Sequence, residues 1–408
     1  RSKAPLIFRN TTQWFISMTT TDLRRTALAA VWHTRFIPEA GRNRLQSMLE
    51  NRPDWCVSRQ RAWGVPITVF VHRETGEPLR DPAVLDRIVE AVHREGADAW
   101  FTSDPARFLG DHDPAEYDQV TDIVDVWFDS GATHAFVLEA RDDLAWPASL
   151  YLEGSDQHRG WFQSSLLEGC GTRGRAPYEA VLTHGFVMDE DGQKMSKSLG
   201  NVVAPQDVVN QYGADILRLW VVSADYTEDL RIGPEILKQQ AEAYRRLRNT
   251  VRFLLGSLRD FDPSERVPVE RMPELERYVL DRLARLDGLV HRACRDYAFH
   301  TAFQELHNFC AVDLSAFYFD IRKDSLYCDA PDSPRRRAVR TVLDILYDTL
   351  TAWLAPFICF TAEEAWQARH PSDRYSVHMR QFPEIPGHWR DERLADKWAR
   401  VRELRRVV

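Results

Sequence analysis

The sequence predicts an α/β domain with a parallel sheet, followed by an all-α helical bundle. Up to about residue 230, short apolar runs rich in β-branched and aromatic residues alternate with turns of Gly, Pro and Asp. After about residue 235, apolar residues recur at helical spacing instead. The chain has 408 residues, of which 44% are hydrophobic, and this is enough for two or three domains with substantial cores.

Three strands are predicted in the first part of the chain. They are the apolar runs at residues 66–71, 149–153 and 180–186, each bounded by turn-forming residues. After the second run, a helix is predicted to begin near Gly154 and to end at Gly169. Strands that alternate with helices favour a parallel sheet.

The second part is predicted to consist of amphipathic helices that pack as a bundle. Two stretches carry the clearest helical spacing. Their apolar faces are Leu275, Val279, Leu283, Leu286 and Val290 in the first, and Val339, Val342, Leu346, Leu350, Trp353 and Phe357 in the second.

The composition argues against several classes of protein. No stretch approaches the roughly 20 apolar residues of a membrane-spanning helix, so no membrane partner is expected. The six cysteines lack the Cys-x-x-Cys spacing of a zinc site, which predicts no bound metal, reduced and mostly buried thiols, and a cytoplasmic location. The net charge of −8 disfavours a protein coated in positive charge but allows a local basic face.

One short loop contains two of the six lysines among the 53 basic residues. This loop, residues 189–201, reads Asp-Glu-Asp-Gly-Gln-Lys-Met-Ser-Lys-Ser-Leu-Gly-Asn, and its two glycines favour a mobile loop. Lysine is a compact charge on a flexible stem, so Lys194 and Lys197 suit neutralisation of charge on a departing pyrophosphate. The alternative for two lysines alone is a solvated surface turn.

A second segment, residues 151–162, reads Tyr-Leu-Glu-Gly-Ser-Asp-Gln-His-Arg-Gly-Trp-Phe. It joins a predicted strand to a helix N-terminus, which is where open α/β sheets bind ligands. The side chains of Glu153, Asp156 and Gln157 suit an ammonium group and ribose hydroxyls. The alternative is an ordinary helix capped by Ser155 or Asp156.

Two further segments, residues 54–66 and 124–131, are rich in tryptophan. Tryptophan supplies a wide and rigid apolar wall, although a single tryptophan is more often part of a core.

Taken together, these strings resemble the class I aminoacyl-tRNA synthetases, and among them the bacterial isoleucyl-tRNA synthetases. Residues 194–198 match the KMSKS signature of the class, and residues 151–162 are more diagnostic because valyl and leucyl relatives differ there. Residues 59–66, 125–131 and 213–220 also resemble this family.

The resemblance implies a domain order and a reaction. Residues 1–40 correspond to the return junction from an editing insertion, residues 41–235 to the second half of a Rossmann-type catalytic domain, and residues 236–408 to a helical anticodon-binding domain. The implied reaction activates L-isoleucine with ATP to isoleucyl-adenylate and then transfers the isoleucyl group to tRNA(Ile). A requirement for Mg²⁺ and a monomeric state are also implied.

The resemblance assigns a role to each matching position of the site. Lys194 and Lys197 are the catalytic lysines, with Lys197 contacting ATP. The other expected ATP contacts are His184, Gly185, Met195, Ser196 and Ser198. The expected adenylate and amino-acid contacts are Glu153, Gly154, Asp156, Gln157, Trp127 and Trp161, and the two tryptophans flank the isoleucine side chain.

Part of the family's machinery is missing from the sequence. It has 13 histidines but no His-x-Gly-His string, the motif that the family carries upstream of its editing insertion. The chain also begins without methionine and ends within a helical pattern. We therefore expect a fragment that lacks the first half of the nucleotide fold, the editing site and the zinc-binding segment, and that does not form isoleucyl-adenylate by itself.

Arginines in the helical part predict contacts with the phosphates of tRNA(Ile). Arg245, Arg248 and Arg252 form one basic cluster together with Arg246, and residues 335–340 form another. Two alternatives to the isoleucine enzyme stay open: a non-catalytic module that binds tRNA, and a synthetase of the valyl or leucyl type.

Overall fold

The computed structural model describes residue 5, residues 10–372 and residues 374–407. Residues 1–4 and 6–9 of the predicted return junction lie outside the described residues. The chain divides into two compact units, residues 1–184 and 185–408, and each is described by itself. The predicted boundaries after residues 40 and 235 stay predictions.

The centre of the first unit is a three-stranded parallel sheet with the strand order β2-β9-β8, which confirms the predicted parallel sheet. The strands are β2 (Arg35–Ile37), β8 (Tyr151–Gly154) and β9 (Ala180–His184). Val181 and Leu182 of the central strand are buried, as expected for a strand covered on both faces.

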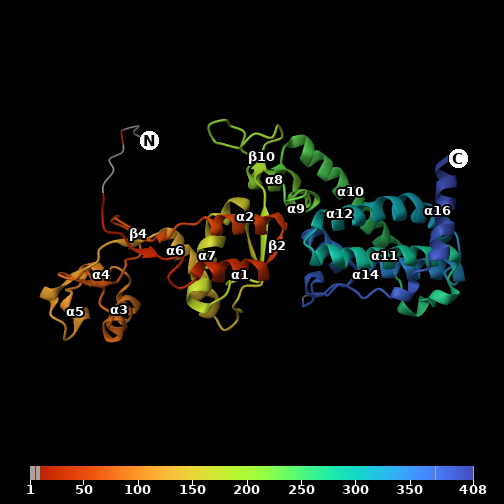
Figure 1. Ribbon diagram of the computed structural model, residues 1–408. Helices are drawn as coiled ribbons and strands as arrows, with labels where there is room; N and C mark the ends of the chain where they lie inside the picture. The colour runs from red at the N-terminus through yellow and green to blue at the C-terminus, as the bar shows by residue number, and fades with distance from the viewer. Residues whose placement is uncertain (1–4, 6–9, 373, 408) are drawn as a thin grey trace. The chain divides into compact units, whose positions relative to one another are not determined.

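Three helices form one core with this sheet: α1 (Leu23–His33), α2 (Ala40–Glu50) and α7 (Trp161–Arg173). Figure 1 shows α1 and α2 in red near α7 in yellow, although they lie far apart in the sequence. Strand β8 is an edge strand among the described residues, and the side chain of Leu152 on it is 51% exposed.

The predicted helix from Gly154 to Gly169 is wrong at both ends. The chain leaves β8 through a 3-10 turn at Ser155–His158, and α7 begins only at Trp161. The helix ends at Gly174, which has a φ of 73°. Gly169 lies inside the helix because a Cβ there would be 2.8 Å from the Pro177 ring, so glycine permits the returning chain to pack closely.

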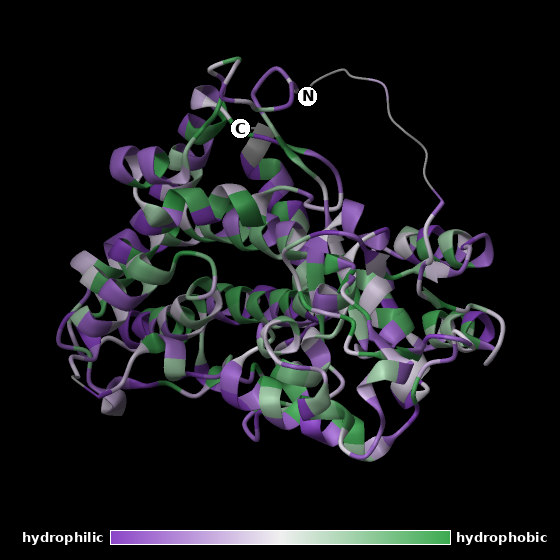
Figure 2. Cartoon of the chain, turned by 90° about the vertical axis from the view of Figure 1, so that its left-hand side faces the viewer, coloured by the Kyte–Doolittle hydropathy of each residue, from purple (hydrophilic) through white to green (hydrophobic). Residues whose placement is uncertain are grey.

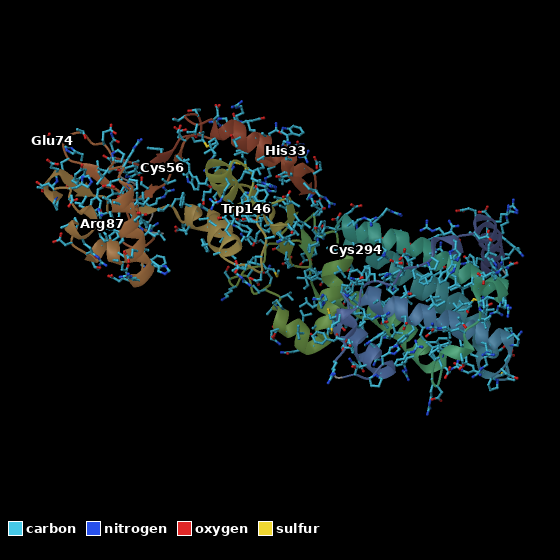
Figure 3. The ribbon with its side chains drawn as sticks, turned by 90° about the horizontal axis from the view of Figure 1, so that it is seen from below. His33, Cys56, Glu74, Arg87, Trp146 and Cys294 are labelled. Carbon is cyan, nitrogen blue, oxygen red and sulfur yellow. The ribbon has the colours of Figure 1, made fainter. Side chains whose placement is uncertain are left out.

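The predicted strand at residues 66–71 is also placed differently. The strand is β5 (Phe70–His72), which pairs antiparallel with β6 (Tyr117–Gln119) outside the parallel sheet. With α3 (Pro82–Glu95), α4 (Ala99–Thr102) and α5 (Ala106–Leu109), this hairpin forms a small core that contains Phe70, Trp100 and Phe108. Glu74, in the turn of this region, and Arg87, on α3, mark it in Figure 3.

Short elements connect this small core to the rest of the first unit. They are β1 (Phe15–Ile16) paired with β3 (Trp55–Cys56), β4 (Ser58–Arg59) paired with β7 (Ile123–Val124), helix α6 (Val126–Gly131) and a π-helical segment at His134–Glu139.

The second unit begins with a short parallel pair, β10 (Val187–Met188) and β11 (Leu230–Arg231). Between these strands lie α8 (Pro205–Tyr212) and α9 (Ala214–Ser223), and after them comes the long helix α10 (Pro234–Ser257). One hydrophobic cluster joins these elements through Val208, Trp220, Ile232 and Leu237.

The remaining helices form the predicted bundle. They are α11 (Glu274–Arg295), α12 (Phe299–Asn308), a π-helical segment (Phe309–Phe319), α13 (Asp320–Tyr327), α14 (Pro334–Leu354), α15 (Cys359–Arg369) and α16 (Glu392–Val407). Every residue of the two predicted apolar faces is buried, which confirms that part of the prediction. Figure 2 shows hydrophobic and hydrophilic residues interleaved around the helices, as in amphipathic helices.

Two side chains of α9 bind the bundle. The carboxylate of Asp215 accepts hydrogen bonds from the backbone N–H groups of Phe360 (3.2 Å) and Thr361 (2.8 Å), and thereby caps the N-terminus of α15. The guanidinium group of Arg218 donates to the carbonyl of Pro356 (2.6 Å) just after α14. Helix α9 is therefore fixed to the corner between α14 and α15.

The cysteines are all free, but the expectation that most are buried is wrong. Only Cys170 and Cys310 are buried, and burial raises the pKa of each thiol to about 12. Cys56, Cys294 and Cys359 are partly exposed and Cys328, in the turn after α13, is exposed; Cys56 and Cys294 are labelled in Figure 3. Among the described residues, no helix is both long and apolar enough to span a membrane.

Replacement of Asp215 by alanine should destabilise the bundle by about 2 kcal/mol, because α15 loses its cap and buried N–H groups lose their acceptor. The urea midpoint of the helical circular dichroism signal measures this change. Asp207→Ala on the exposed side of α8 is the control and should cost less than about 0.5 kcal/mol. Equal midpoints for the two variants would contradict the capping role.

Candidate active site

The carboxyl ends of β8 and β9 bring three of the predicted site residues together. Gly154 is the register partner of His184 in the parallel sheet. A Cβ on Gly154 would lie 2.6 Å from Oδ1 of Asp156 and 3.7 Å from Cε1 of His184, so both side chains lie close to the Gly154 backbone. This edge of a parallel sheet is where α/β folds bind their ligands.

Gln157 connects this edge to the N-terminus of α7. Its Oε1 accepts a hydrogen bond from the backbone N–H of Trp161 (3.0 Å), and its Nε2 donates to Oδ2 of Asp156 (3.0 Å). The residue that caps α7 is therefore Gln157, and the alternative of a cap by Ser155 or Asp156 is wrong for this helix. Gln157 is thereby oriented from both sides.

The two predicted tryptophans both lie beside the turn at residues 155–160. A Cβ on Gly160 would be 2.8 Å from the ring of Trp127, so this ring lies directly against the Gly160 backbone. The ring of Trp161 stacks on Tyr151 with a centroid distance of 3.9 Å and an interplanar angle of 6°. Trp127 is 42% exposed and Trp161 is partly buried, so each presents apolar surface beside the turn at residues 155–160.

Helix α6 and the residues beside it position the rings of Trp127 and Trp161. The indole Nε1–H of Trp161 donates to the carbonyl of Ser130 (2.9 Å) and to Oγ1 of Thr133 (3.0 Å). At the start of α6, the buried carboxylate of Asp125 accepts from the Trp127 backbone N–H (3.2 Å) and from the indole N–H of Trp55 (3.1 Å). Asp125 thus joins the two tryptophan-rich segments.

The carboxylate of Glu153 lies exposed at the end of β8 and has no hydrogen bond or ion pair among the described residues. A carboxylate in this condition retains its full capacity to bind an ammonium group or a hydroxyl. Its neighbour is Gly154, and the absence of a side chain there lets a ligand approach the backbone closely.

Sequence reasoning did not identify Glu168, a buried carboxyl on α7. Only 8% of its surface is exposed, and its Oε1 lies beside Gly131, without a hydrogen-bond partner among the described residues. Burial, and then the nearby Asp129, raise the pKa of Glu168 to about 8. The carboxyl is therefore protonated at neutral pH beneath α6. No local pattern indicates its burial, because a glutamate within a helix has the same kind of sequence context whether its side chain is buried or exposed.

The signature loop, defined as residues 189–201, has an internal hydrogen-bond framework in the second unit. The Oδ2 of Asp189 accepts from the side-chain amide of Asn201 (2.8 Å), and the Oδ1 of Asn201 accepts from the backbone N–H of Ser196 (2.9 Å). The side-chain oxygens of Ser196 and Ser198 lie 3.1 Å apart. Its two glycines, Gly192 and Gly200, both have positive φ values.

The lysines of the signature loop differ from the other lysines that the structure describes. Lys238 pairs with Glu235, Lys323 with Asp320, and Lys397 with Glu274. Lys194 and Lys197 are exposed, and neither ammonium group has a hydrogen bond or an ion pair in the described part of the chain. Two exposed ammonium groups without ion-pair partners in one loop are suited to bind phosphate groups.

Gly185 shows why the entry to this loop contains glycine. A Cβ there would lie 2.2 Å from the carbonyl oxygen of Glu228, so no side chain fits at this position. His184 and the residues before it belong to the first unit, whereas Gly185 and the signature loop belong to the second.

The two arginine clusters differ in availability. Arg245, Arg246, Arg248 and Arg252 are all exposed on α10, and Arg245 pairs with Glu242 on the same helix. In the other cluster, Arg340 is buried and binds Glu265 (2.8 Å), and Arg335 pairs with Asp329. The expectation that residues 335–340 form a phosphate-binding cluster therefore loses Arg340, because its charge is already satisfied inside the bundle.

Comparisons with known proteins identify the family. Residues 3–233 match the model of the class I tRNA synthetases for isoleucine, leucine, methionine and valine, and residues 276–408 match that of the anticodon-binding domain of tRNA ligases. The chain belongs to the class I tRNA synthetases.

Within this class, curated relatives similar to the chain include isoleucine–tRNA ligases. Those of Mesorhizobium japonicum and Gluconobacter oxydans are each 60% identical to the chain, and that of Pelagibacter ubique is 54% identical. All of this chain is covered in each case, but only 41%, 42% and 45% of the respective relatives. The chain thus spans less than half of their length.

Two solved structures share the fold. A Mycobacterium tuberculosis methionyl-tRNA synthetase bound by methionyl-adenylate has a TM-score of 0.64 and 17% identity, and covers 95% of this chain and 70% of that chain. An Agrobacterium radiobacter leucyl enzyme, solved in a ternary complex with tRNA, has a TM-score of 0.59 and 19% identity, and covers 86% of this chain and 45% of that one.

The raised pKa of Glu168 predicts a pH-dependent stability. An unfolded glutamate titrates near 4.5 and the folded one near 8, so the native state holds this proton more tightly. The stability that this proton contributes is complete below pH 4.5 and is lost as the pH rises to about 8. In Glu168→Gln, the urea midpoint of the first unit should fall less over this pH range than in the wild type. Parallel midpoint curves for the two proteins would contradict the buried, protonated carboxyl.

Proposed function

We propose that this chain supplies the adenylate-binding sheet edge, the signature loop and the anticodon-binding bundle of an isoleucyl-tRNA synthetase. The proposed reaction activates L-isoleucine with ATP and then transfers the isoleucyl group to tRNA(Ile). One observation carries the proposal: Lys194 and Lys197 in the KMSKS loop have no ion pair among the described residues. The chain that contains this loop is 60% identical to an isoleucine–tRNA ligase. The chain's other described lysines are all ion-paired.

In the proposed activation step, a carboxylate oxygen of isoleucine attacks the α-phosphorus of ATP, and pyrophosphate leaves with the electrons of the broken P–O bond. Lys194 and Lys197 stabilise the charge that develops on the departing phosphates. Ser196 and Ser198 add hydroxyl donors, and Met195 holds the loop backbone. The protein thus acts through positioning and charge, without a covalent intermediate.

On the sheet edge, the carboxylate of Glu153 is proposed to bind the adenylate, and Asp156 and Gln157 the ribose and the ammonium group of isoleucine. Gly154 lets the nucleotide approach the backbone, and His184 and Gly185 lie beside the adenine. Trp127 and Trp161 form the walls of the isoleucine pocket. These roles are supported by the oriented Gln157 and by the free carboxylate of Glu153.

We infer that Mg²⁺ enters as a complex with ATP. No group of three or more His, Cys, Asp or Glu side chains suited to a metal ion occurs in the part of the chain that the structure describes. Mg²⁺ usually keeps several water ligands and binds through one or two carboxylates together with substrate phosphates, so phosphate oxygens and water are the expected ligands. A cytoplasmic location is also proposed, supported by six free thiols.

Lys197→Arg in the full-length enzyme should lower isoleucine-dependent exchange of labelled pyrophosphate into ATP by about 100-fold, because a rigid planar group replaces a compact cation. Lys238→Arg is the matched control, since its partner Glu235 accepts either cation, and its activity should stay within about twofold of the wild type. Similar, mild effects of both changes would remove the loop lysine from the reaction.

The 408-residue chain alone should not catalyse this exchange at a measurable rate, because its sequence has no His-x-Gly-His motif. The exchange assay on the isolated chain and on the full-length enzyme tests this expectation. A rate for the chain that approached the full-length rate would refute it.

The exposed arginines of α10 should make tRNA binding steeply dependent on salt. In filter binding, alanine at Arg245, Arg248 and Arg252 together should reduce the slope of log affinity against log salt by about 2, because Arg245 already pairs with Glu242 and the other two have no ion pair among the described residues. Arg335→Ala, which removes an arginine already paired with Asp329, should change this slope by less than about 0.5. A slope unaffected by the triple change would place the tRNA contact elsewhere.

A further inference from the structure

We propose that Glu190 is a positioning residue that anchors the signature loop to the N-terminus of α10. The proposal rests on the proposed function for its catalytic consequence, but the anchor itself is a property of the second unit alone. It gives a role to a residue that neither the sequence motif nor the resemblance singled out.

The contact is a helix cap supplied from the loop. The Oε1 of Glu190 accepts hydrogen bonds from the backbone N–H groups of Glu235 (3.1 Å) and Ile236 (3.3 Å), in the first turn of α10. Helix α10 begins at Pro234 after Gly233, and neither residue offers a side-chain cap. A carboxylate at this end also interacts favourably with the helix dipole. Glu190 therefore completes a helix start that lacks a cap of its own.

Gly233 makes room for this contact. A Cβ on Gly233 would lie 2.5 Å from Cβ of Glu190 and 2.6 Å from its carboxylate carbon. The φ of Gly233 is −175°, which is an extended conformation open to any residue. Glycine is therefore required here by the closeness of Glu190 and not by backbone conformation.

A second contact lies beside the lysines. Met195 packs against the cluster that contains Trp220 and Leu237, and Leu237 is in the first turns of α10. The sulfur of Met195 also accepts from the backbone N–H of Val203 (3.4 Å). The loop is thus held near α10 by a polar contact at its beginning and an apolar contact between its two lysines.

These contacts matter because the lysines have no other support. Neither Lys194 nor Lys197 has a side-chain partner among the described residues, so the loop backbone sets where their ammonium groups lie. Helix α10 has 24 residues and continues into the bundle core through Leu247 and Leu254. The signature loop is therefore fixed to helix α10, a rigid helix that also carries the exposed arginines.

Limited proteolysis tests the anchor without relying on catalysis. Trypsin cleaves after Lys194 and Lys197, and mass spectrometry identifies these two cuts. Glu190→Ala should accelerate them about tenfold, equivalent to about 1.4 kcal/mol of lost loop fixation. Gly233→Ala, which lies outside the loop, should act in the same direction because it displaces Glu190. Glu190→Gln keeps the acceptor oxygen and should stay within about twofold of the wild type.

Glu235→Ala is the matched control, because it removes an acidic side chain from the same helix turn without touching the loop. Its loop cleavage should equal that of the wild type. Equal cleavage of Glu190→Ala and wild type would overturn the proposal. An equal acceleration in Glu235→Ala would also overturn it, because the effect would then be fraying of α10.

The catalytic consequence is measured in the full-length enzyme by pyrophosphate exchange. Glu190→Ala should reduce kcat/KM for ATP about tenfold, while KM for isoleucine stays constant, because the sheet edge is unchanged. A parallel change in both substrates would contradict a role in positioning the loop. A wild-type enzyme without any exchange would refute the proposed function instead, and the cleavage rates would still decide the anchor.

Discussion

The parallel pairing of β8 with β9 is the constraint on which the candidate site depends. It places Gly154 opposite His184, so the turn that carries Asp156 and Gln157 starts at the same edge at which β9 ends. A shift of one residue would exchange the faces of β8 and turn Glu153 away from this edge. Tyr151 of β8 opposes such a shift, because it is buried in the core and would be turned to the other face of the sheet.

In the second unit, hydrogen bonds at helix N-termini fix the positions of the neighbouring elements. Asp215 caps α15 from α9, and Glu190 caps α10 from the signature loop. In both cases, a carboxylate far away in the sequence satisfies N–H groups that the helix cannot satisfy itself. The Gly-Ala-Asp-Ile-Leu-Arg run at residues 213–218 is thus explained by the attachment of α9 to the bundle. The caps of α10 and α15 come from other elements, so the positions of the loop, α9, α10 and α15 depend on one another.

The sequence was informative where a structure follows from local pattern. The helical spacing of apolar residues predicted the buried faces of α11 and α14. The match to the KMSKS motif drew attention to Lys194 and Lys197. The sequence was uninformative where contacts between distant residues decide. The antiparallel partner of Phe70 is Gln119, nearly fifty positions away in the sequence. Gly169 is required by the close approach of Pro177 and does not end a helix. Burial of Glu168 and capping by Glu190 likewise depend on neighbours that no periodicity reveals.

Specificity for isoleucine is what distinguishes the proposed function from that of other class I synthetases, since the KMSKS signature is shared by the class. The most direct measurement is the amino-acid dependence of pyrophosphate exchange by the full-length enzyme, with isoleucine, valine, leucine and methionine as substrates. We expect the highest kcat/KM for isoleucine, with valine lower by about 10- to 200-fold, since one methylene in an apolar pocket is worth about 1–3 kcal/mol. A higher kcat/KM for valine, leucine or methionine would contradict it.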